Sequence, residues 1–411
     1  MAEVHPLQAL YYDLDEVGSL QSVISPPYDV IDPQQREELK ARSKYNVVDI
    51  DLPVGDDPYE TAAKTLTTWI GDGAVVRDGE PALWALRQSY TDPEGNDRVR
   101  NGFLARVKVE EYGPGKIRPH ERTHPGPKED RLRLTRATKT NLSPIFALHN
   151  GDAWTALAPD GEPWATATDD EGTVNTLWRI SDPDRISAVQ AVLADSELLI
   201  ADGHRRYETA RVYAEEMGGE GEHNFVLMCL VSLEDPGLLI FPTHRLVTVP
   251  EGKRELLRDR LMELFDLERI EQSDLRPPDG EGPLQLGYID SFHKQAFRLT
   301  LKDQSLAAEA LADFPEPYQR LDTAVLEALI LKGPLGLTED DISHLHGLGY
   351  SRTDDEALQA VLSGEFDAAF FMRATPVSQV QEIAAAGVNM PPKSTFFYPK
   401  VPTGLLFNPL Q

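Results

Sequence analysis

The stretch Leu198-Leu-Ile-Ala-Asp-Gly-His-Arg-Arg-Tyr-Glu-Thr-Ala210 combines an apolar run, a tight turn and a basic segment. Residues 198–201 form the apolar run, which favours a short buried strand, and Asp202-Gly203 ends it. Residues 205–217 then have the spacing of a helix that Gly218-Gly219 terminates. We therefore expect a strand, a turn and a helix in immediate succession.

This succession predicts an anion-binding site at the start of the helix. The free N–H groups of a first helical turn and the helix dipole both favour negative charge. Gly203 allows the backbone to approach a ligand closely, and Arg205 and Arg206 add forked donors that match phosphate or carboxylate. The alternative is an ordinary surface loop with a solvated basic pair.

The same residues carry a resemblance. Gly203, Arg206 and Ala210 resemble the Gly-x-x-Arg-x-x-x-Ala phosphate-binding box of the ParB/sulfiredoxin-like superfamily, which includes nucleotide-using enzymes such as archaeal free serine kinases. Over its whole length the chain resembles the domain-of-unknown-function 1015 family. The matching blocks are residues 25–30, 120–123, 127–132, 141–146, 202–210 and 390–395. The resemblance implies a ParB/sulfiredoxin-like strand-turn-helix unit, nucleotide use, and serine or phosphoserine chemistry.

Composition narrows the classes of function. The 411 residues are 41% hydrophobic and 26% charged, as in a soluble globular protein, and the net charge of −28 disfavours binding to nucleic acid or to anionic membranes. The chain has neither an apolar run of transmembrane length nor the pattern of a signal peptide. Cys229 is the single cysteine and lies in an apolar run, so we expect an inert core thiol and a cytoplasmic location.

One region has the opposite charge. Between residues 100 and 141, eleven Lys/Arg stand against five Asp/Glu, a local charge of +6. A basic region within a strongly acidic protein favours a focused site for a small anion. The alternative is a basic, solvated face.

Residues 113–142 contain several prolines, among them Pro119, Pro125 and Pro127, and little periodicity, which predicts a long loop. Within it, His120 and Glu121 can exchange protons near neutral pH, while Lys128 and Arg131 can bind anionic oxygens. We expect this loop and the turn before the basic helix to converge on one cleft. The alternative is a proline-rich surface connection.

The order of apolar segments predicts an α/β or α+β fold with mixed sheets and flanking helices. We expect an N-terminal α/β region with the basic loop (1–150), a ParB/sulfiredoxin-like core (151–275) and a C-terminal α+β region with a Lys-Ser-Thr tail (276–411). Helices are predicted at 33–42, 59–70, 182–195, 251–265, 321–331, 354–362 and 377–386. Strands are predicted at 47–50, 82–90, 98–109, 145–148, 225–233, 238–241, 286–289, 295–301 and 368–372, with hairpins at 92–97 and 235–237.

These features favour a cytoplasmic enzyme that moves or removes a phosphate on a small molecule, of the kinase or phosphatase type. The candidate catalytic residues are His120, Glu121, Asp202 and His204. The candidate substrate- and phosphate-binding residues are Lys128, Arg131, Asn141, Ser143, Gly203, Arg205, Arg206, His244, Lys393 and Ser394.

The expected partner is a small anionic metabolite or a nucleotide (ATP or ADP), with Mg²⁺ as the accompanying ion and no metal site formed by the protein alone. No nucleic-acid or membrane partner is expected, and the oligomeric state is left open. The alternative function is a non-catalytic nucleotide or metabolite sensor, because it needs the same basic clamp. A catalytic function predicts that His120→Ala or Asp202→Asn abolishes turnover while ligand binding survives.

Overall fold

The computed structural model describes residues 2–122 and 128–411. These residues form two compact units. Unit 1 contains described residues 2–119, 128–238 and 399–411, and unit 2 contains described residues 120–122 and 239–398. The last residues of the chain therefore return to the unit in which it begins. The division of the sequence at residues 150 and 275 stays a prediction.

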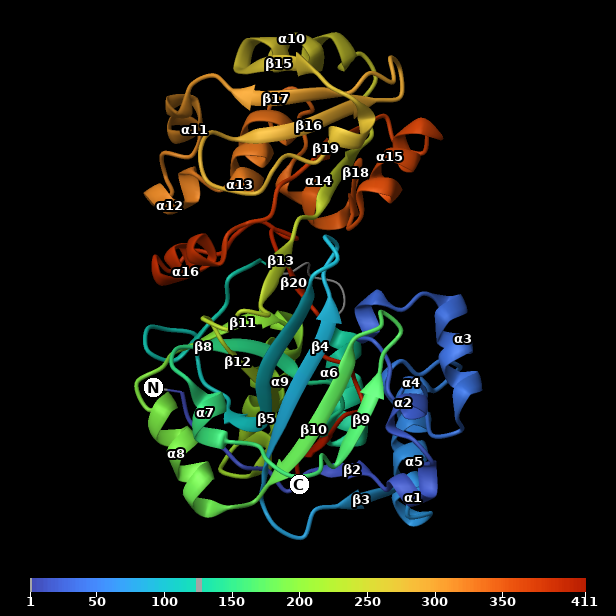
Figure 1. Ribbon diagram of the computed structural model, residues 1–411. Helices are drawn as coiled ribbons and strands as arrows, with labels where there is room; N and C mark the ends of the chain where they lie inside the picture. The colour runs from blue at the N-terminus through green and yellow to red at the C-terminus, as the bar shows by residue number, and fades with distance from the viewer. Residues whose placement is uncertain (1, 123–127) are drawn as a thin grey trace. The chain divides into compact units, whose positions relative to one another are not determined.

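Unit 1 contains a nine-stranded mixed sheet (Figure 1). Its order is β6-β11-β8-β12-β5-β4-β10-β9, with β1 added on β5. The pairs β6/β11 and β8/β12 are parallel and the others are antiparallel. The strands are β1 (Val4–His5), β4 (Leu83–Thr91), β5 (Asp97–Lys108), β6 (Ile117–Arg118), β8 (Ile145–His149), β9 (Ala165–Thr168), β10 (Val174–Ile180), β11 (Leu198–Asp202) and β12 (Phe225–Ser232).

Helices and two small sheets complete unit 1. The helices are α1 (Leu14–Val17), α2 (Leu20–Val23), α3 (Pro33–Arg42), α4 (Val48–Asp51), α5 (Pro58–Gly71), α6 (Lys128–Thr138), α7 (Ala153–Leu157), α8 (Pro183–Leu193) and α9 (His204–Met217), with short 3₁₀ turns at Tyr28–Val30 and Glu222–Asn224. The small sheets pair β2 (Leu10–Tyr12) with β3 (Val75–Arg77) and β7 (Thr140–Asn141) with β21 (Asn408–Pro409). Helix α9 packs on β8, β12 and α6.

Burial of apolar side chains from both the sheet and the helices forms the core of unit 1. Ile145, Ile200 and Met228 come from three neighbouring strands, while Val189 of α8 and Tyr207 of α9 join the same cluster. Each buried large apolar side chain contributes about 1.5–3 kcal/mol. The strand that precedes α9 is therefore anchored in the core of unit 1 between β6 and β8, which fixes where α9 begins.

Unit 2 contains a six-stranded antiparallel sheet in the order β15-β17-β16-β19-β14-β18. Its strands are β14 (His244–Val247), β15 (Phe265–Arg269), β16 (Gln285–Asp290), β17 (Phe297–Leu301), β18 (Leu348–Ser351) and β19 (Ala368–Phe371), and β13 (Leu239–Phe241) pairs separately with β20 (Phe396–Tyr398). Its helices are α10 (Arg254–Leu264), α11 (Gln304–Ala310), α12 (Glu316–Gln319), α13 (Asp322–Leu326), α14 (Glu339–His344), α15 (Asp354–Leu362) and α16 (Val377–Ala385). A 3₁₀ turn spans Gln272–Asp274, and a π-helical turn, Glu327–Leu331, continues α13.

The mixed α/β architecture agrees with the predicted fold class, and several boundaries agree closely. Asp32 caps α3 by accepting a hydrogen bond from the Gln35 N–H, and Asp182 caps α8 in the same manner through the Asp184 N–H. In both helices a proline occupies the first position, as the sequence predicts. The 92–97 hairpin is also present, because β4 and β5 pair antiparallel on either side of it.

Three local predictions are wrong. Residues 47–50 were predicted to form a strand, but α4 occupies this position. The Asn46 side chain accepts a hydrogen bond from the Val48 N–H and so begins a helical turn. A short buried apolar run of this length does not distinguish a strand from a helical turn by its pattern.

The predicted hairpin at 235–237 is wrong because both edges of β12 are already paired, with β5 and with β8. The returning strand β13 pairs instead with β20. The predicted loop at 113–142 contains β6, α6 and β7, and residues 123–127 of it lie outside the described residues. In α6, ion pairs join Glu129 to Arg133 and Arg136 across successive turns.

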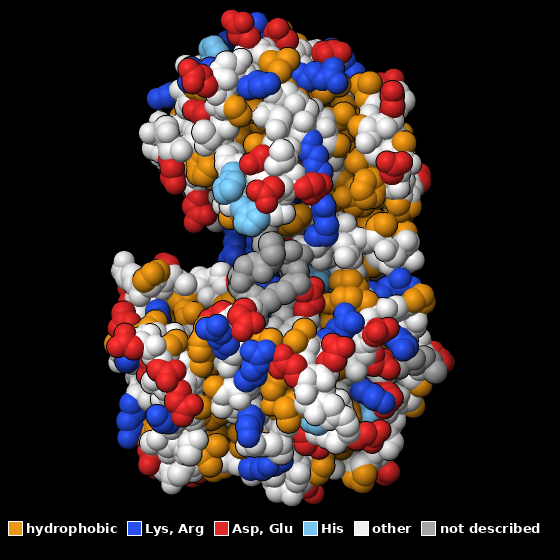
Figure 2. Space-filling view, turned by 180° about the vertical axis from the view of Figure 1, so that it is seen from behind, with side chains coloured by type: hydrophobic (Ala, Val, Ile, Leu, Met, Phe, Trp, Pro, Cys, Tyr) orange, Lys and Arg blue, Asp and Glu red, His pale blue; other side chains and the backbone are white. Residues whose placement is uncertain are grey.

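None of the described helices is both long enough and apolar enough to cross a membrane. Acidic, basic and apolar side chains are interspersed over the face drawn in Figure 2. Cys229 is buried in β12, and this burial raises the pKa of its thiol to about 12, which agrees with the predicted inert thiol.

Candidate functional site

Helix α9 begins directly after the buried strand β11. Gly203 has a φ of +94°, in the left-handed region, and this conformation turns the chain from the strand into the helix. Gly203 is the N-cap residue of α9 and has no side chain with which to cap the helix. The first intrahelical bond runs from the Tyr207 N–H to the Gly203 carbonyl, so the preceding N–H groups point out of the helix end.

The Arg206 side chain folds back beside this turn. Its guanidinium donates to the Pro144 carbonyl and lies 3.4 Å from an Asp202 carboxylate oxygen. The same Asp202 oxygen lies 3.5 Å from Nζ of Lys400. Asp202 therefore sits between two cations, and its side chain keeps 23% of its surface exposed.

Arg206 of α9 and Arg131 of α6 line a single pocket, which we call the unit 1 pocket. Its volume is about 40 Å³, and Tyr28, Asp51, Asn141, Ser143 and Thr209 also line it. The expected convergence of the basic segment with the α9 turn is therefore observed for these two arginines. In the sequence they are 75 residues apart.

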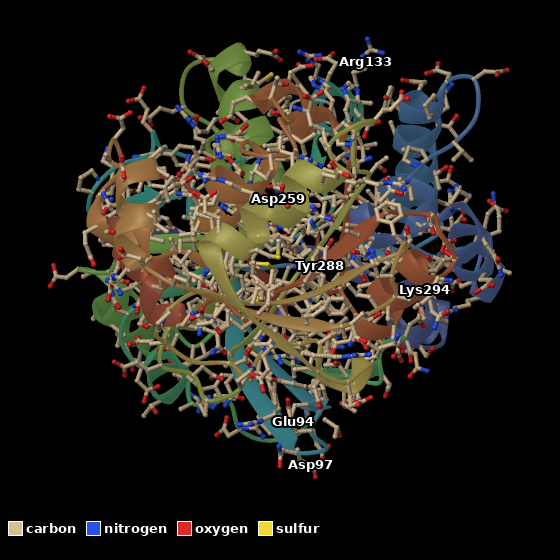
Figure 3. All side chains as sticks on the ribbon, turned by 90° about the horizontal axis from the view of Figure 1, so that it is seen from above. Glu94, Asp97, Arg133, Asp259, Tyr288 and Lys294 are labelled. Atoms are coloured by element: carbon tan, nitrogen blue, oxygen red, sulfur yellow. The ribbon has the colours of Figure 1, made fainter. Side chains whose placement is uncertain are left out.

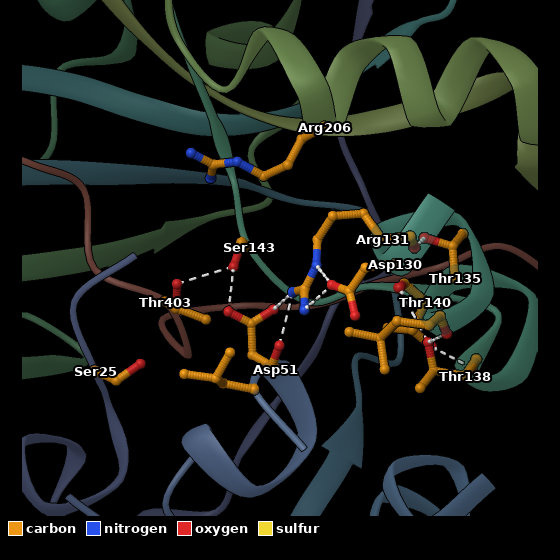
Figure 4. A network of polar contacts seen from close by, with 12 residues as sticks. Ser25, Asp51, Asp130, Arg131, Thr135, Thr138, Thr140, Ser143, Arg206 and Thr403 are labelled. Carbon is orange, nitrogen blue, oxygen red and sulfur yellow. Dashed lines mark hydrogen bonds and ion pairs between the residues drawn. The ribbon is translucent and has the colours of Figure 1, made fainter. Parts of the chain in front are cut away.

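Three neighbours fix the Arg131 guanidinium, and Figure 4 shows two of them, Asp51 and Asp130. It lies over the ring of Tyr28, with 4.1 Å between Cζ and the ring centroid. It donates to the Asp51 backbone carbonyl at 2.7 Å and lies 3.4 Å from the carboxylate of the same residue. Its Nε donates to Asp130 at 2.8 Å. The guanidinium is thus held rigidly at the pocket wall.

Asp51 is the carboxylate of this pocket and is buried. The Ser143 hydroxyl donates to it at 2.9 Å and is itself 2.9 Å from the Thr403 hydroxyl. Burial raises the pKa of Asp51, and this outweighs the lowering effects of Arg131 and the Ser143 hydrogen bond. The network of Asp51, Ser143 and Thr403 holds the carboxylate in place beside Arg131.

Thr209 supplies an unsatisfied polar group. The residue lies on α9 less than one turn after Arg206, is only 6% exposed, and lines the unit 1 pocket. Its hydroxyl has no hydrogen-bond partner among the described residues. A buried polar group of this kind costs about 1–3 kcal/mol when it remains unpaired, so it favours a ligand or an ordered water there.

Asn141 lines the unit 1 pocket and also holds neighbouring strands together. The Asn141 side-chain oxygen accepts hydrogen bonds from the Leu227 N–H and from the Asn408 amide, so it joins β12 and β21. His204 is the first residue of α9 and is buried, while Arg205 beside it is partly exposed. Arg205 contributes to the positive potential at Tyr28 together with the two pocket arginines.

Two further predicted residues, His120 and Glu121, lie in unit 2. His120 is buried, and its Nε2 is 2.7 Å from the Thr395 hydroxyl. Glu121 forms a parallel bridge with Met390, and backbone bonds join Met390 to His120 and Arg122. The sequence blocks 120–123 and 390–395 therefore bind each other through their described residues.

The remaining predicted residues of unit 2 are engaged in local contacts. His244 is fully buried; its Nε2 donates to Asp354 at 2.7 Å, and its Nδ1 accepts the Met372 N–H. The Lys393 carbonyl accepts a hydrogen bond from the buried Arg245. The Ser394 hydroxyl is buried between the Pro391 carbonyl and the Thr323 hydroxyl.

The predicted site is thus divided between the units. Unit 1 contains Arg131, Asn141, Ser143, Asp202, Gly203, His204, Arg205 and Arg206, and unit 2 contains His120, Glu121, His244, Lys393 and Ser394. Lys128 begins α6, and its side chain lies outside what the structure describes.

Sequence reasoning missed Tyr28, Asp51 and Thr209. Tyr28 and Thr209 lie inside the family-like blocks 25–30 and 202–210, which was the available signal. Asp51 directly follows the segment that was wrongly predicted as a strand.

The carboxylates and histidines of the described residues do not form any cluster of three or more that could hold a metal ion. A Mg²⁺ ion that accompanies a nucleotide usually needs only one or two protein carboxylates, because phosphates and water complete its shell. Asp202 is a partly exposed carboxylate at the α9 turn and fits that requirement.

Comparisons with known proteins place the fold in context. No curated protein matches the chain. A conserved hypothetical protein from Pyrococcus furiosus is 14% identical, with 73% of this chain and 93% of that chain covered and a TM-score of 0.38. Free serine kinase in complex with AMP is 12% identical, with 72% and 86% covered and a TM-score of 0.39. SbnI with a C-terminal truncation, from Staphylococcus aureus, is 12% identical, with 72% and 84% covered and a TM-score of 0.37.

A family model extends over most of the sequence. Residues 4–324 match the model described as "Protein of unknown function (DUF1015)". The match includes every residue named above as lining the unit 1 pocket. The chain belongs to the DUF1015 family.

Proposed function

We propose that the unit 1 pocket binds the phosphoryl group of a small molecule and that unit 1 belongs to a phosphotransferase or phosphatase. One observation carries the proposal. Two arginines from separate helices and an unpaired, buried hydroxyl line one pocket at the first turns of α9. Helix N-termini and forked arginine donors are both suited to phosphate oxygens.

Size and charge support a phosphoryl group as the occupant. A pocket of about 40 Å³ has space for a few water-sized groups and not for a whole nucleotide. Two arginines stand against the single buried carboxylate of Asp51, so the local charge favours an anion. In a protein with a net charge of −28, such a site attracts small anions without attracting polyanions.

The proposed roles follow from accessibility. Arg131, Arg206 and the Thr209 hydroxyl would hold phosphoryl oxygens. Asp202, which is partly exposed, would act as the general base or as a ligand of Mg²⁺ carried by a nucleotide. Phosphoryl transfer depends mainly on positioning and charge neutralisation, which these groups supply. Catalytic roles for His120, Glu121 and His204 stay predictions.

A thermal-shift screen tests the proposal first. The full chain is mixed with ATP, ADP, CTP, phosphoserine, serine or sulfate, each with and without Mg²⁺. A ligand that binds only the folded state raises the melting temperature by mass action. A Mg²⁺-dependent shift with a nucleotide supports a kinase, and a shift with phosphoserine alone supports a phosphatase. The absence of a shift with every anion contradicts the phosphate site.

Turnover separates an enzyme from a sensor. With the ligand found in the screen, Asp202→Asn is expected to bind with an affinity near that of the wild type and to lose turnover. Thr155→Ala is the control, because the Thr155 hydroxyl donates to Asp152, the N-cap of α7, and Thr155 does not line the unit 1 pocket. If the wild type binds the ligand and has no turnover with any nucleotide or phosphoester, the protein is a sensor that uses the same pocket.

A further inference from the structure

Unit 2 contains a much larger cavity that neither the proposed function nor the predicted residues use. It lies between α10 and the strands β15, β16 and β17, and we call it the α10 groove. Its volume is about 860 Å³, within the range of about 300–1,000 Å³ that is typical of small-molecule sites. The size alone is sufficient for a ligand of many atoms.

The walls of the α10 groove are largely apolar. Leu257 and Leu261, which are both buried, line the groove from α10, and Phe297 lines it from β17. Two other lining residues leave large apolar surfaces in solvent, since Met262 is 48% exposed and Leu267 is 40% exposed. Covering apolar surface that lines a cavity and faces water lowers the free energy. Such surface therefore favours the binding of a ligand.

The rim of the α10 groove is basic. Arg254, Arg258 and Arg269 line it. Arg258 is paired with Asp259, whereas Arg254 and Arg269 have no ion-pair partner among the described residues. The Arg254 guanidinium lies over the Phe292 ring, 3.5 Å from the ring centroid.

The only buried carboxylate among the lining residues is already hydrogen-bonded within the protein. Asp290 accepts hydrogen bonds from the Tyr288 hydroxyl and from the N–H groups of Phe292 and His293. Figure 3 shows Tyr288 beside α10, the helix that carries Asp259. The charges available to a ligand are therefore mainly those of the arginines, with Glu255 as the one opposing exposed carboxylate.

We propose that the α10 groove binds a free amphiphilic carboxylate, a molecule with one elongated apolar chain and an anionic head group. The lining residues of α10 extend from Arg254 to Met262, which corresponds to about 12 Å along the helix axis and suits an extended chain. The apolar walls would cover the chain, while Arg269 would bind the head group through forked hydrogen bonds. In a protein of net charge −28, two arginines without acidic partners favour an anion over a cation.

The test compares three probes of equal chain length by isothermal titration calorimetry on the full chain. Decanoate is expected to bind at least about tenfold more tightly than decylamine, with decan-1-ol between them, since a hydrogen bond to a charged group is worth about 1.5–3 kcal/mol. Equal binding of decanoate and decylamine would overturn the proposal, as would the absence of binding by all three. Self-association of the chain that decanoate does not alter would show that a second copy covers the groove and would overturn the proposal too.

Two variants locate the site. Arg269→Ala is expected to weaken decanoate binding about tenfold and to leave decan-1-ol binding within about twofold. Leu267→Glu places a charge on an exposed wall position and is expected to remove binding of both probes. Arg260→Ala is the matched control, because Arg260 also lies on α10 but pairs with Glu263 and does not line the groove. If Arg269→Ala and Arg260→Ala bind decanoate equally, the head-group assignment is wrong.

Discussion

The sequence blocks that characterise this family meet in two places, and the two meeting points differ in kind. In unit 1, residues from blocks 25–30, 127–132, 141–146 and 202–210 surround a pocket. In unit 2, the described parts of blocks 120–123 and 390–395 bind directly to each other. We infer that the polar residues of these blocks mark a ligand site only where their side chains border open space.

Two buried arginines show the same difference. Arg131 in unit 1 faces the carboxylate of Asp51, and although burial lowers its pKa, the nearby acids more than compensate. Arg245 in unit 2 donates only to backbone carbonyls, those of Thr243, Pro392 and Lys393, and burial lowers its pKa. We infer that Arg131 belongs to a charged pocket, whereas Arg245 holds the segment at residues 392–393 in place.

The largest expected effect concerns the pocket carboxylate. Asp51→Ala removes the buried carboxylate beside the Arg131 guanidinium and the acceptor of the Ser143 hydroxyl, although the backbone carbonyl of residue 51 remains, and is expected to lower the free energy of unfolding by about 3–5 kcal/mol. Asp130→Ala removes the other, more exposed partner of Arg131 and is expected to cost less than about 1 kcal/mol. Urea denaturation measures both variants. Equal losses of unfolding free energy would show that the two carboxylates stabilise Arg131 equally. The buried carboxylate would then have no special role in the pocket.

A smaller loss of stability is expected at the corresponding point in unit 2. Ser394→Ala removes the partner of the Thr323 hydroxyl and frees the Pro391 carbonyl, at a cost of about 1–3 kcal/mol. Ser378→Ala is the control, because Ser378 is exposed on α16, and it is expected to change the free energy of unfolding by less than about 0.5 kcal/mol. Ligand binding in the unit 1 pocket should be unchanged in the Ser394→Ala variant. A selective loss of binding would instead indicate that Ser394 contributes to the phosphate site.

The two ends of α9 provide a sharper test. Gly203 and Gly218 both have positive φ values, and alanine at either position is expected to cost about 1–2 kcal/mol of stability. A Cβ atom at Gly203 would lie 3.1–3.2 Å from the Arg206 guanidinium, whereas one at Gly218 would meet nothing within 4 Å. Only Gly203→Ala is therefore expected to weaken binding of the screened anion, as measured by calorimetry. If both variants bound the anion equally, the turn at Gly203 would not be part of the binding site.

The smallest expected effect is a difference in pH dependence. Burial raises the pKa of Asp51 above its ordinary value of 3.8, so the folded state binds more protons between these two values and stability falls as the pH rises through them. The hydrogen bond from His244 lowers the pKa of Asp354, so stability is lost as the pH falls through that lowered pKa.

Urea denaturation at a series of acidic pH values measures both slopes, each expected to be below about 1.4 kcal/mol per pH unit for a single group. Asp51→Asn should remove the first slope and Asp354→Asn the second. If both variants change the pH dependence in the same direction, the contrast between the buried Asp51 and the exposed Asp354 is wrong.

Local signals in the sequence predict much of the fold. Asp32 and Asp182 each precede a proline at a helix start, and both helices begin there. The Asp202-Gly203 turn predicts the start of α9, and Gly218 predicts its end. These predictions succeed because capping and left-handed turns depend on neighbouring residues alone.

Non-local contacts account for what the sequence does not reveal. The pairing of β13 with β20 joins residues far apart in the chain, and nothing in the turn at 235–237 indicates it. Asp51 contributes to the unit 1 pocket because α4 delivers it to Arg131, 80 positions away. The pattern of α6 is mainly charged, and its ion pairs across turns are visible only once the helix is assumed.

The most direct test of the central claim is equilibrium binding of ADP, with and without Mg²⁺, to the wild type and to two arginine variants. Arg206→Ala removes a pocket guanidinium and is expected to weaken binding about tenfold to a hundredfold, because a hydrogen bond to a charged group is worth about 1.5–3 kcal/mol. Arg133→Ala is the control, since Arg133 lies on α6, is exposed and pairs with Glu129. A loss confined to Arg206→Ala is the result that the account predicts. Equal affinity in the wild type, Arg206→Ala and Arg133→Ala would contradict it.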